Sequence, residues 1–267
     1  MSGVRLQDRN VVITGGGSGI GQACARLMAA EGAIVTIADR DLAAAERTAR
    51  SICSSGFRCE AYDVDVTVES QLKDLMTCAD GRGGIDVVLA AAGVFQPRVG
   101  GHSEDWSDPS AGRVSSQDLA VWDETLAVNL RGTMLTLRSA IPHLSRRGAP
   151  PSIITIASGA AFIPIAGRSA YCVSKAGVWM LTKCVALELA DQGVRVNCIA
   201  PGHILSPMTA ELFGDPEVLR ITVGTIPLGR LGTPEDVAGT ALFLSGDDSR
   251  YMTGKILFPD GGLFTGG

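Results

Sequence analysis

The chain has 267 residues, of which 46% are hydrophobic and 19% are charged, and its formal net charge is −5. This composition is typical of one folded α/β domain and excludes a disordered chain. The acidic balance argues against nucleic acid and anionic membrane surfaces as partners. No apolar run is long enough to span a bilayer, so no membrane partner is expected.

The 7 cysteines are scattered and lack the paired spacing of a zinc site or of a disulfide framework. Reduced thiols and no bound metal are therefore expected. Residues 1–10 carry interspersed charges and lack the apolar stretch of a secretory signal. These features together predict a cytoplasmic protein.

Short runs rich in β-branched residues alternate with longer amphipathic stretches along the chain. The predicted strands are Asn10–Thr14, Ala33–Ala38, Arg58–Val64, Ile85–Ala91, Ser152–Ser158, Val194–Ala200 and Ile256–Phe258. The predicted helices are Gly19–Glu31, Leu42–Ser54, Val68–Asp80, Leu119–Leu144, Ser174–Asp191 and Pro234–Leu244. Several strands are apolar nearly throughout, which indicates burial on both faces of a parallel sheet. The alternation predicts a Rossmann-type, doubly wound α/β fold of about seven strands in a single domain spanning residues 1–267.

A glycine-rich turn joins the first predicted strand to the first predicted helix. It reads Thr14-Gly15-Gly16-Gly17-Ser18-Gly19-Ile20-Gly21. Glycines let the backbone turn sharply and approach a ligand, and the helix N-terminus directs its amides at a phosphate. A phosphate-transfer loop would need Lys followed by Ser or Thr after the last glycine, where Gln22-Ala23 stands. The turn therefore favours binding of a dinucleotide.

Asp39 ends the second predicted strand. An acidic residue at about this distance from the glycines accepts hydrogen bonds from the adenosine ribose hydroxyls, and its charge repels a 2′-phosphate. This favours NAD over NADP. The adjacent Arg40 argues the other way, because a guanidinium pairs well with that phosphate. Asp39 also fits the N-cap position of the next helix, a place that Asp41 fills equally well.

Four polar residues are candidates for catalysis: Asn129, Ser158, Tyr171 and Lys175. Tyr171 and Lys175 are one helical turn apart and so share one face of a helix. Taken singly, each has an ordinary structural interpretation, such as a solvated helix pair, a turn serine or an asparagine that bonds neighbouring backbone. Spacing along the sequence does not bring the four together.

The motifs in this order resemble the short-chain dehydrogenase/reductase family over essentially the whole chain. The matching residues are Thr14-Gly15-x-x-x-Gly19-Ile20-Gly21, Asp65-Val66-Thr67, Asn129, Ser158, Tyr171-x-x-x-Lys175, Pro201-Gly202, Gly229-Arg230-Leu231-Gly232-x-Pro234-Glu235-Asp236-Val237-Ala238 and Asp260-Gly261-Gly262. The resemblance implies an oxidoreductase that moves a hydride between the nicotinamide ring and a small-molecule secondary alcohol or ketone. It also implies a homotetramer or dimer, joined through the long helices and the C-terminal segment.

The resemblance further implies a role for each candidate residue. Tyr171 would be the general acid/base, and Lys175 would lower its pKa and bind the nicotinamide ribose. Ser158 would orient the substrate oxygen, and Asn129 would hold a water that links Lys175 to solvent. The residues implied to bind NAD are Gly15, Ser18, Gly19, Ile20, Gly21, Asp39, Arg40, Asp65, Val66, Ala91, Ala92, Gly93, Tyr171, Lys175, Pro201, Gly202, Ile204 and Ser206.

Two positions depart from the family pattern. The family's Asn-Asn-Ala-Gly after the fourth strand is replaced by Ala90-Ala91-Ala92-Gly93. The asparagine side-chain bonds that brace the central sheet are therefore expected to be lost, with some loss of rigidity but not of function. The usual threonine after Pro-Gly is replaced by Ser206, which keeps a hydroxyl for the carboxamide.

Residues 203–226 take the place of the family's variable substrate lid. Apolar side chains in this segment, with Phe95 and Phe162, suit a hydrophobic or alicyclic secondary alcohol, and packing of the lid against the domain explains them equally well.

Three further features have two interpretations each. Arg168 either lies at the surface or pairs with an acidic group of the substrate. His203 either contacts the substrate or caps its own loop. The long loop Val99–Gln117 is either a lid or a surface loop.

Two other functions fit less well. An NADPH-dependent ketoreductase of the 3-oxoacyl-carrier-protein type would need basic residues at the cofactor edge, where Asp39 stands. A non-catalytic cofactor-sensing protein would typically lose Tyr171 or Lys175, and both are present. The sequence therefore favours an NAD-dependent enzyme that interconverts a secondary alcohol and a ketone.

Overall fold

The computed structural model describes residues 4–95, 112–145, 148 and 150–265. Within them, parallel strands form one seven-stranded sheet in the order β3-β2-β1-β4-β5-β6-β7. The strands are β1 Asn10–Thr14, β2 Ile34–Asp39, β3 Arg58–Asp63, β4 Val87–Ala90, β5 Ser152–Ile156, β6 Arg195–Ile199 and β7 Ile256–Leu257. The strand order reverses between β1 and β4, which is the switch point of a doubly wound sheet. The predicted fold class is confirmed.

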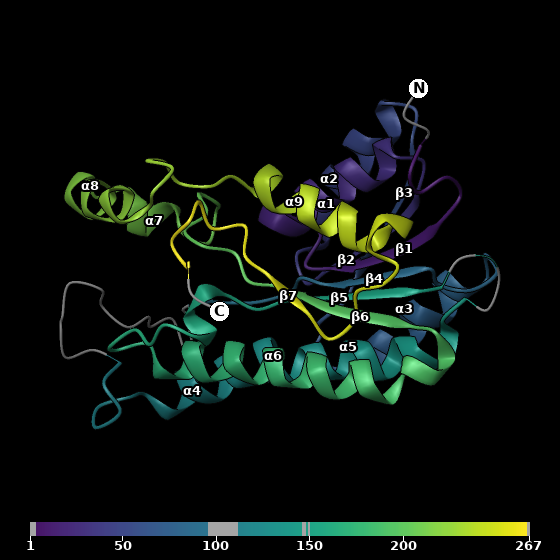
Figure 1. The fold of residues 1–267 in the computed structure, drawn as a ribbon. Coiled ribbons are helices and arrows are strands. Elements are labelled where there is room, and N and C mark those ends of the chain that lie inside the picture. Colours follow the sequence, from purple (N-terminus) through teal and green to yellow (C-terminus); the bar gives the residue numbers. More distant parts are fainter. Residues whose placement is uncertain (1–3, 96–111, 146–147, 149, 266–267) are drawn as a thin grey trace.

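The sheet is covered by helices on both faces (Figure 1). Helices α1 Gly19–Ala30, α2 Leu42–Ser54 and α9 Pro234–Ser245 lie on one face. Helices α3 Glu69–Asp80, α4 Leu119–Leu126, α5 Gly132–Ala140 and α6 Ser169–Glu188 lie on the other. Two short helices, α7 Ala210–Phe213 and α8 Pro216–Thr225, project beyond the sheet.

The central strands are buried along their whole length, in agreement with their apolar sequences. Their side chains alternate between the two faces: Val11 and Ile13 of β1 join the cluster beneath α1 and α9, whereas Val12 joins the cluster beneath α3 and α5. All seven predicted strands are present; burial on both faces gives the central four a strong apolar signal, whereas the edge strands β3 and β7 are only partly buried.

The predicted helix Leu119–Leu144 is present as one helical stretch up to His143, but it is not regular along its length. A π-helical turn at Ala127–Arg131 separates α4 from α5, and a 3₁₀ turn at Ile141–His143 comes after α5. A π-turn inserts an extra residue into a helix and redirects the next turns, and it often marks a functional site. Apolar periodicity does not reveal it, so the sequence predicted the helical stretch but not its π-turn.

Helix α6 begins at Ser169, five residues before the predicted start at Ser174. It follows Gly167, whose φ of +74° turns the chain into the helix. Helix α8 was not predicted, although Asp215 caps it by accepting from the amide of Glu217, and Pro216 occupies its first position. These are ordinary start signals that the apolar pattern alone did not supply.

The predicted loop Val99–Gln117 falls outside the described residues up to 111, and residues 112–117 form turns that lead into α4. Asp118 caps that helix by accepting from the amide of Ala120. Within the described part of the chain, no helix is both long and apolar enough to cross a membrane.

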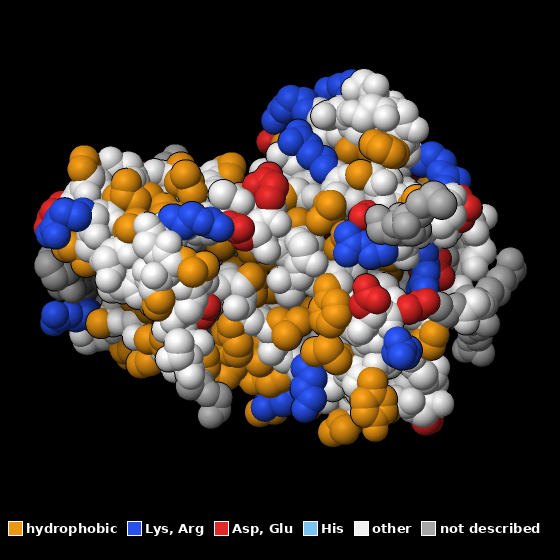
Figure 2. Space-filling view, turned by 45° about the horizontal axis from the view of Figure 1, so that its top comes forward, with side chains coloured by type: hydrophobic (Ala, Val, Ile, Leu, Met, Phe, Trp, Pro, Cys, Tyr) orange, Lys and Arg blue, Asp and Glu red, His pale blue; other side chains and the backbone are white. Residues whose placement is uncertain are grey.

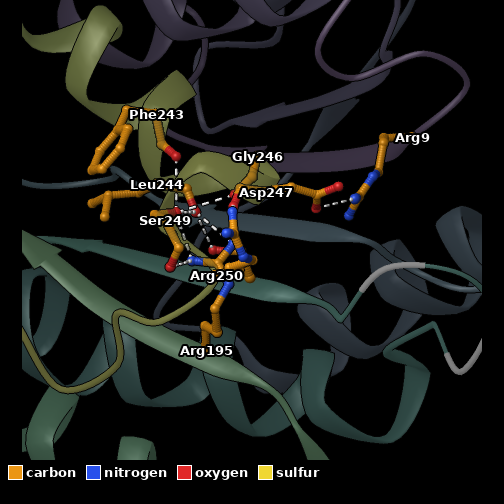
Figure 3. A network of polar contacts seen from close by, with 9 residues as sticks. Arg9, Arg195, Phe243, Leu244, Gly246, Asp247, Ser249 and Arg250 are labelled. Carbon is orange, nitrogen blue, oxygen red and sulfur yellow. Dashed lines mark hydrogen bonds and ion pairs between the residues drawn. The ribbon is translucent and has the colours of Figure 1, made fainter.

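A buried arginine ties β6 to α9 at the amino ends of the strands (Figure 3). The guanidinium of Arg195 donates to the carbonyls of Leu244 and Gly246 at the end of α9, and to the carbonyl and hydroxyl of Ser249. Nearby, Arg9 forms an ion pair with Asp247 at 3.1 Å. A cation at a helix C-terminus is favourable because it meets the unpaired carbonyls and the negative end of the helix dipole. This network lies opposite the carboxyl ends of the strands.

Candidate active site

A cavity of about 310 Å³ opens at the carboxyl ends of the strands. Its walls come from the turn after β1, the ends of β2, β4, β5 and β6, and the first turns of α6. Since β2 and β3 lie on one side of β1 and β5 and β6 on the other, the cavity extends along the edge of the sheet. Asp39 and Asp65 mark one end, and Tyr171 marks the other. Ligands bind at this place in doubly wound folds.

The cavity gathers residues from distant parts of the sequence. Every residue predicted to bind the cofactor lines it, and so do Ser158, Tyr171 and Lys175 of the four catalytic candidates. Asn129 is fully buried behind it. Met208, expected in the apolar lid, also lines the cavity, whereas the prediction missed several lining residues that flank the expected ones or lie near α4 and in the lid: Val64, Val94, Val128, Ile156, Ala157, Pro207 and Thr209. Most of them lie close to the carboxyl end of a predicted strand, and this position could have identified them as cavity residues.

The glycine turn packs too closely for side chains. Gly15 has a φ of +72°, and a Cβ there would lie 2.6 Å from the backbone of Ala92. A Cβ at Gly21 would lie 2.2 Å from the carbonyl oxygen of Gly15. Among the described residues, the N-cap Ser18 makes no side-chain capping bond and no acidic residue lies in the first turn of α1. The first amides of α1 therefore face the cavity as ready donors, which fits a pyrophosphate.

The carboxylate of Asp39 is held by backbone donors beside this turn. It accepts from the amide of Gly17 at 2.9 Å and from the amide of Asp41 at 3.0 Å. Asp41, not Asp39, is the N-cap of α2, accepting from the amide of Ala44. The capping interpretation of Asp39 is therefore wrong, and its carboxylate stays at the rim of the cavity.

Ser158, Tyr171 and Lys175 come together at the opposite end. The ammonium of Lys175 lies 5.7 Å from the ring centroid of Tyr171 and donates to the carbonyl of Ile156 at 3.0 Å. Ser158 caps the 3₁₀ turn Gly159–Ala161, and its hydroxyl acts on Tyr171 in the direction that lowers the pKa of the phenol. A hydroxyl pair beside a buried cation is suited to proton transfer at a substrate oxygen.

Burial is the main influence on the pKa values of Tyr171 and Lys175. Burial raises the pKa of Tyr171, and the Ser158 hydroxyl opposes this only in part. Burial also lowers the pKa of Lys175 to about 8. The sequence predicted that Lys175, together with the oxidised nicotinamide, lowers the pKa of Tyr171; among the protein's own groups burial is the largest cause and raises that pKa, so the lowering stays a prediction. The ammonium lies over the ring and bonds to a backbone carbonyl, so removal of the phenol from water is the larger effect.

Asn129 acts as a brace within the protein. Its side-chain amide donates to the carbonyl of Val94 at 2.8 Å and to the hydroxyl of Ser174 at 3.1 Å, while its oxygen accepts from the amide of Val94 at 2.7 Å. A Cβ at Gly93 would lie 3.2 Å from that oxygen and 3.3 Å from the ammonium of Lys175. The bonds join the segment after β4 to α6 at Ser174, the residue before Lys175. The water relay implied for Asn129 stays a prediction.

Ala90, which stands where the family has an asparagine, leaves a polar group of the neighbouring strand β1 without a described partner. Thr14 and Ala90 are register partners in β1 and β4. The Thr14 hydroxyl is buried and has no hydrogen-bond partner among the described residues. A short methyl at Ala90 offers nothing to pair with it, in agreement with the expected loss of an asparagine brace.

The remaining candidates lie outside the described lining of the cavity. Burial lowers the pKa of His203, whose ring meets that of Phe213 in α7 at 6.1 Å. The guanidinium of Arg168 donates to the carbonyl of Gly167 at 2.8 Å. Phe162 packs instead into an aromatic cluster with three side chains from α6 and the C-terminal segment, namely Trp179, Phe258 and Phe264. Among the described residues, no group of His, Cys, Asp and Glu side chains is placed to hold a metal.

These features define a class of protein: a doubly wound α/β fold with a glycine turn for phosphates and a Ser–Tyr–Lys group along one cavity. A family model described as enoyl-(acyl carrier protein) reductase matches residues 15–264. The chain belongs to the short-chain dehydrogenase/reductase family, whose members are oxidoreductases that bind NAD or NADP.

Individual relatives agree over almost the whole chain. The 3β-hydroxysteroid dehydrogenase 1 of Eggerthella lenta is 38% identical over 260 residues, which cover 97% of this chain and 94% of that protein. The 2,5-dichloro-2,5-cyclohexadiene-1,4-diol dehydrogenase of Sphingobium indicum is 36% identical over 263 residues, 98% of each chain. A crystal structure from Beutenbergia cavernae that contains NADP superposes with a TM-score of 0.86 at 32% identity, covering 98% of this chain and 99% of that one.

Proposed function

We propose that this protein is an NAD-dependent dehydrogenase that interconverts a secondary alcohol and a ketone, with Tyr171 as the general acid/base. The observation that carries the proposal is the convergence of Ser158, Tyr171 and Lys175 at one end of a cavity whose other end presents the glycine turn and Asp39. The bound nicotinamide supplies or accepts the hydride. The chain's own residues handle the proton and the orientation of the substrate.

In this mechanism the Ser158 hydroxyl donates to the substrate oxygen and holds it near the Tyr171 hydroxyl. Tyr171 gives its proton to that oxygen during ketone reduction and takes it back during alcohol oxidation. Lys175, with a pKa of about 8, is mostly protonated at neutral pH and places a positive charge beside the tyrosine. Lys175 is buried and the two hydroxyl residues are partly buried, which limits access of water and strengthens each of these interactions.

Asp39 supports NAD as the cofactor. The amides of Gly17 and Asp41 hold its carboxylate in a fixed place at the cavity rim, where it suits the hydroxyls of a ribose and repels a 2′-phosphate. The second candidate is an NADPH-dependent ketoreductase. It is favoured by Arg40, which also lines the cavity, and by the NADP in the related structure.

The surroundings of the cavity support an apolar, alicyclic substrate. Met208 lines the cavity, and with Leu205 it is half-exposed at the base of the lid. Hydrophobic side chains gather between the lid helices and the body of the domain (Figure 2). The two relatives act, by their names, on a hydroxysteroid and a cyclohexadiene diol. An apolar entrance with few polar groups selects such ring alcohols.

An apolar face on α6 supports an oligomer. Val173, Met180 and Leu187 follow one another at heptad spacing on α6 and are exposed. Beside them, a groove between α4, α5 and α6 is lined by Leu126, Ala127, Leu130, Met134 and Leu181, with Asp123 and Arg131 at its margin. Contiguous exposed apolar side chains of this kind mark interaction surfaces when the patch they form is large. We propose that a second copy covers it in a dimer or tetramer, which light scattering of the purified protein tests.

The decisive experiment follows NADH formation across a panel of cyclic secondary alcohols, hydroxysteroids, sugar alcohols and hydroxy acids, repeated with NADP. Turnover of ring alcohols with NAD is the expected result. A strong preference for NADP would replace the proposal by the ketoreductase. Absence of turnover with both cofactors across the panel would contradict an alcohol dehydrogenase of this kind.

A further inference from the structure

Arg40 is the cation at the adenosine end of the cavity. Of the described lining residues, Arg40 and Lys175 carry positive charge, and Lys175 lies at the catalytic end beside Tyr171. The 2′-phosphate that distinguishes NADP from NAD attaches to the ribose that Asp39 is proposed to bind. Arg40 directly follows Asp39 at the end of β2. The Arg40 guanidinium is therefore the group that would form an ion pair with such a phosphate.

Arg40 already faces a carboxylate from a different element. Its Nη1 lies 4.0 Å from Oε1 of Glu124 in α4. Glu124 stands one helical turn before Val128, which lines the cavity, so the pair lies at the rim of the cofactor site. The two carboxylates adjacent to Arg40 in sequence are held by backbone amides instead, Asp39 beside the glycine turn and Asp41 at the start of α2.

We propose that Glu124 is a specificity-determining residue that holds Arg40 toward α4 and so keeps the cofactor preference on NAD. The inference rests on the proposed function, since it concerns the same cavity. Before Arg40 turns to a 2′-phosphate, its pair with Glu124 has to open, which disfavours NADP relative to NAD. The Arg40 side chain is 64% exposed and that of Glu124 is 38% exposed. The effect of the ion pair on cofactor preference is therefore modest and decreases with added salt.

The test measures the dissociation constants of NAD and NADP by calorimetry on the full chain without substrate, so that it does not depend on turnover. The variants are Glu124→Gln, Arg40→Ala and the two combined. In Glu124→Gln the ratio of NADP affinity to NAD affinity rises by about two- to fivefold at low salt, the range of an exposed ion pair. In the Arg40→Ala background the same change leaves the ratio unaltered, because the freed guanidinium is no longer there.

Glu188→Gln is the matched control. It removes the same charge in nearly the same shape from the C-terminal end of α6, which lies at the opposite end of the sheet from the cavity. A ratio in Glu124→Gln equal to that of this control would overturn the inference. So would a rise that persists in full in the Arg40→Ala background, because Glu124 would then act on the phosphate directly and not through Arg40.

Failure of the proposed function has a different signature. If the unaltered protein binds neither nucleotide, the proposed function and this inference fall together. If it binds NAD and the ratio stays constant across all variants, the inference alone is overturned.

Discussion

The ring of Phe95 meets the ring of Tyr171 edge to face, with centroids 4.7 Å apart and planes at 80°. The ammonium of Lys175 lies 5.7 Å from the same Tyr171 centroid. The phenol is therefore held by contacts from the segment after β4 as well as from its own helix. Such a contact orients the ring and excludes water from it.

Replacing Phe95 by Ala is expected to admit water to Tyr171. Because burial is what raises the pKa of Tyr171, wetting lowers that pKa, and the acidic limb of the pH–rate profile for alcohol oxidation moves to lower pH. Turnover falls by about three- to tenfold, the value of one aromatic contact. Phe95→Leu, which keeps apolar bulk, is the control and shifts the profile less. An unmoved profile in Phe95→Ala would argue against this role.

The Tyr171→Phe variant tests the acid/base assignment. It keeps the ring and its contact with Phe95 but removes the hydroxyl, so turnover falls by on the order of 10²–10⁴ while NAD binding is retained. Tyr251 is 99% exposed, and Tyr251→Phe is the matched control with unaltered turnover. Rates of NADH formation and nucleotide titration measure the two quantities. Near-normal turnover in Tyr171→Phe would remove Tyr171 from the mechanism.

Thr14 and Thr36 allow the same Thr→Val substitution to be compared, by its effect on the free energy of unfolding, with and without a described hydrogen-bond partner. Both are buried strand residues, but the Thr36 hydroxyl accepts from Arg82 at 3.1 Å whereas that of Thr14 has no described partner. Thr14→Val is expected to raise the free energy of unfolding by about 1 kcal/mol, since it removes a polar group buried without a hydrogen bond. Thr36→Val lowers it by about 1–2 kcal/mol. Urea denaturation measures both, and a loss of stability in Thr14→Val would show that its hydroxyl has a partner.

Arg195 is expected to be a major determinant of stability. Its fork-shaped guanidinium reaches the carbonyls at the end of α9 and that of Ser249 together (Figure 3). A lysine keeps the charge but not the fork, so Arg195→Lys leaves buried carbonyls unpaired and lowers the free energy of unfolding by about 2–4 kcal/mol. Arg250→Lys, at an exposed residue in the same region, changes it by less than about 0.5 kcal/mol. Equal effects of the two variants would contradict the importance of the buried network.

Much of this protein was predictable from local signals in the sequence. The central strands were predictable because burial on both faces requires continuous apolar runs, and the glycine turn because its close approaches admit no Cβ. The lid helix α8 had a visible start in Asp215-Pro216, although it was not predicted. Such features are visible in residues adjacent in the chain, although the contact that requires Gly15 is with the distant Ala92.

Other features were decided by the tertiary structure. The burial that raises the pKa of Tyr171 and the pairing of Arg40 with Glu124 each depend on residues far apart in sequence. Resemblance to a family named the catalytic group and implied that Lys175 lowers the pKa of Tyr171, but it did not reveal the burial that raises that pKa. The physical reason is that backbone conformation is set locally, whereas desolvation and charge pairing depend on which elements the fold packs together.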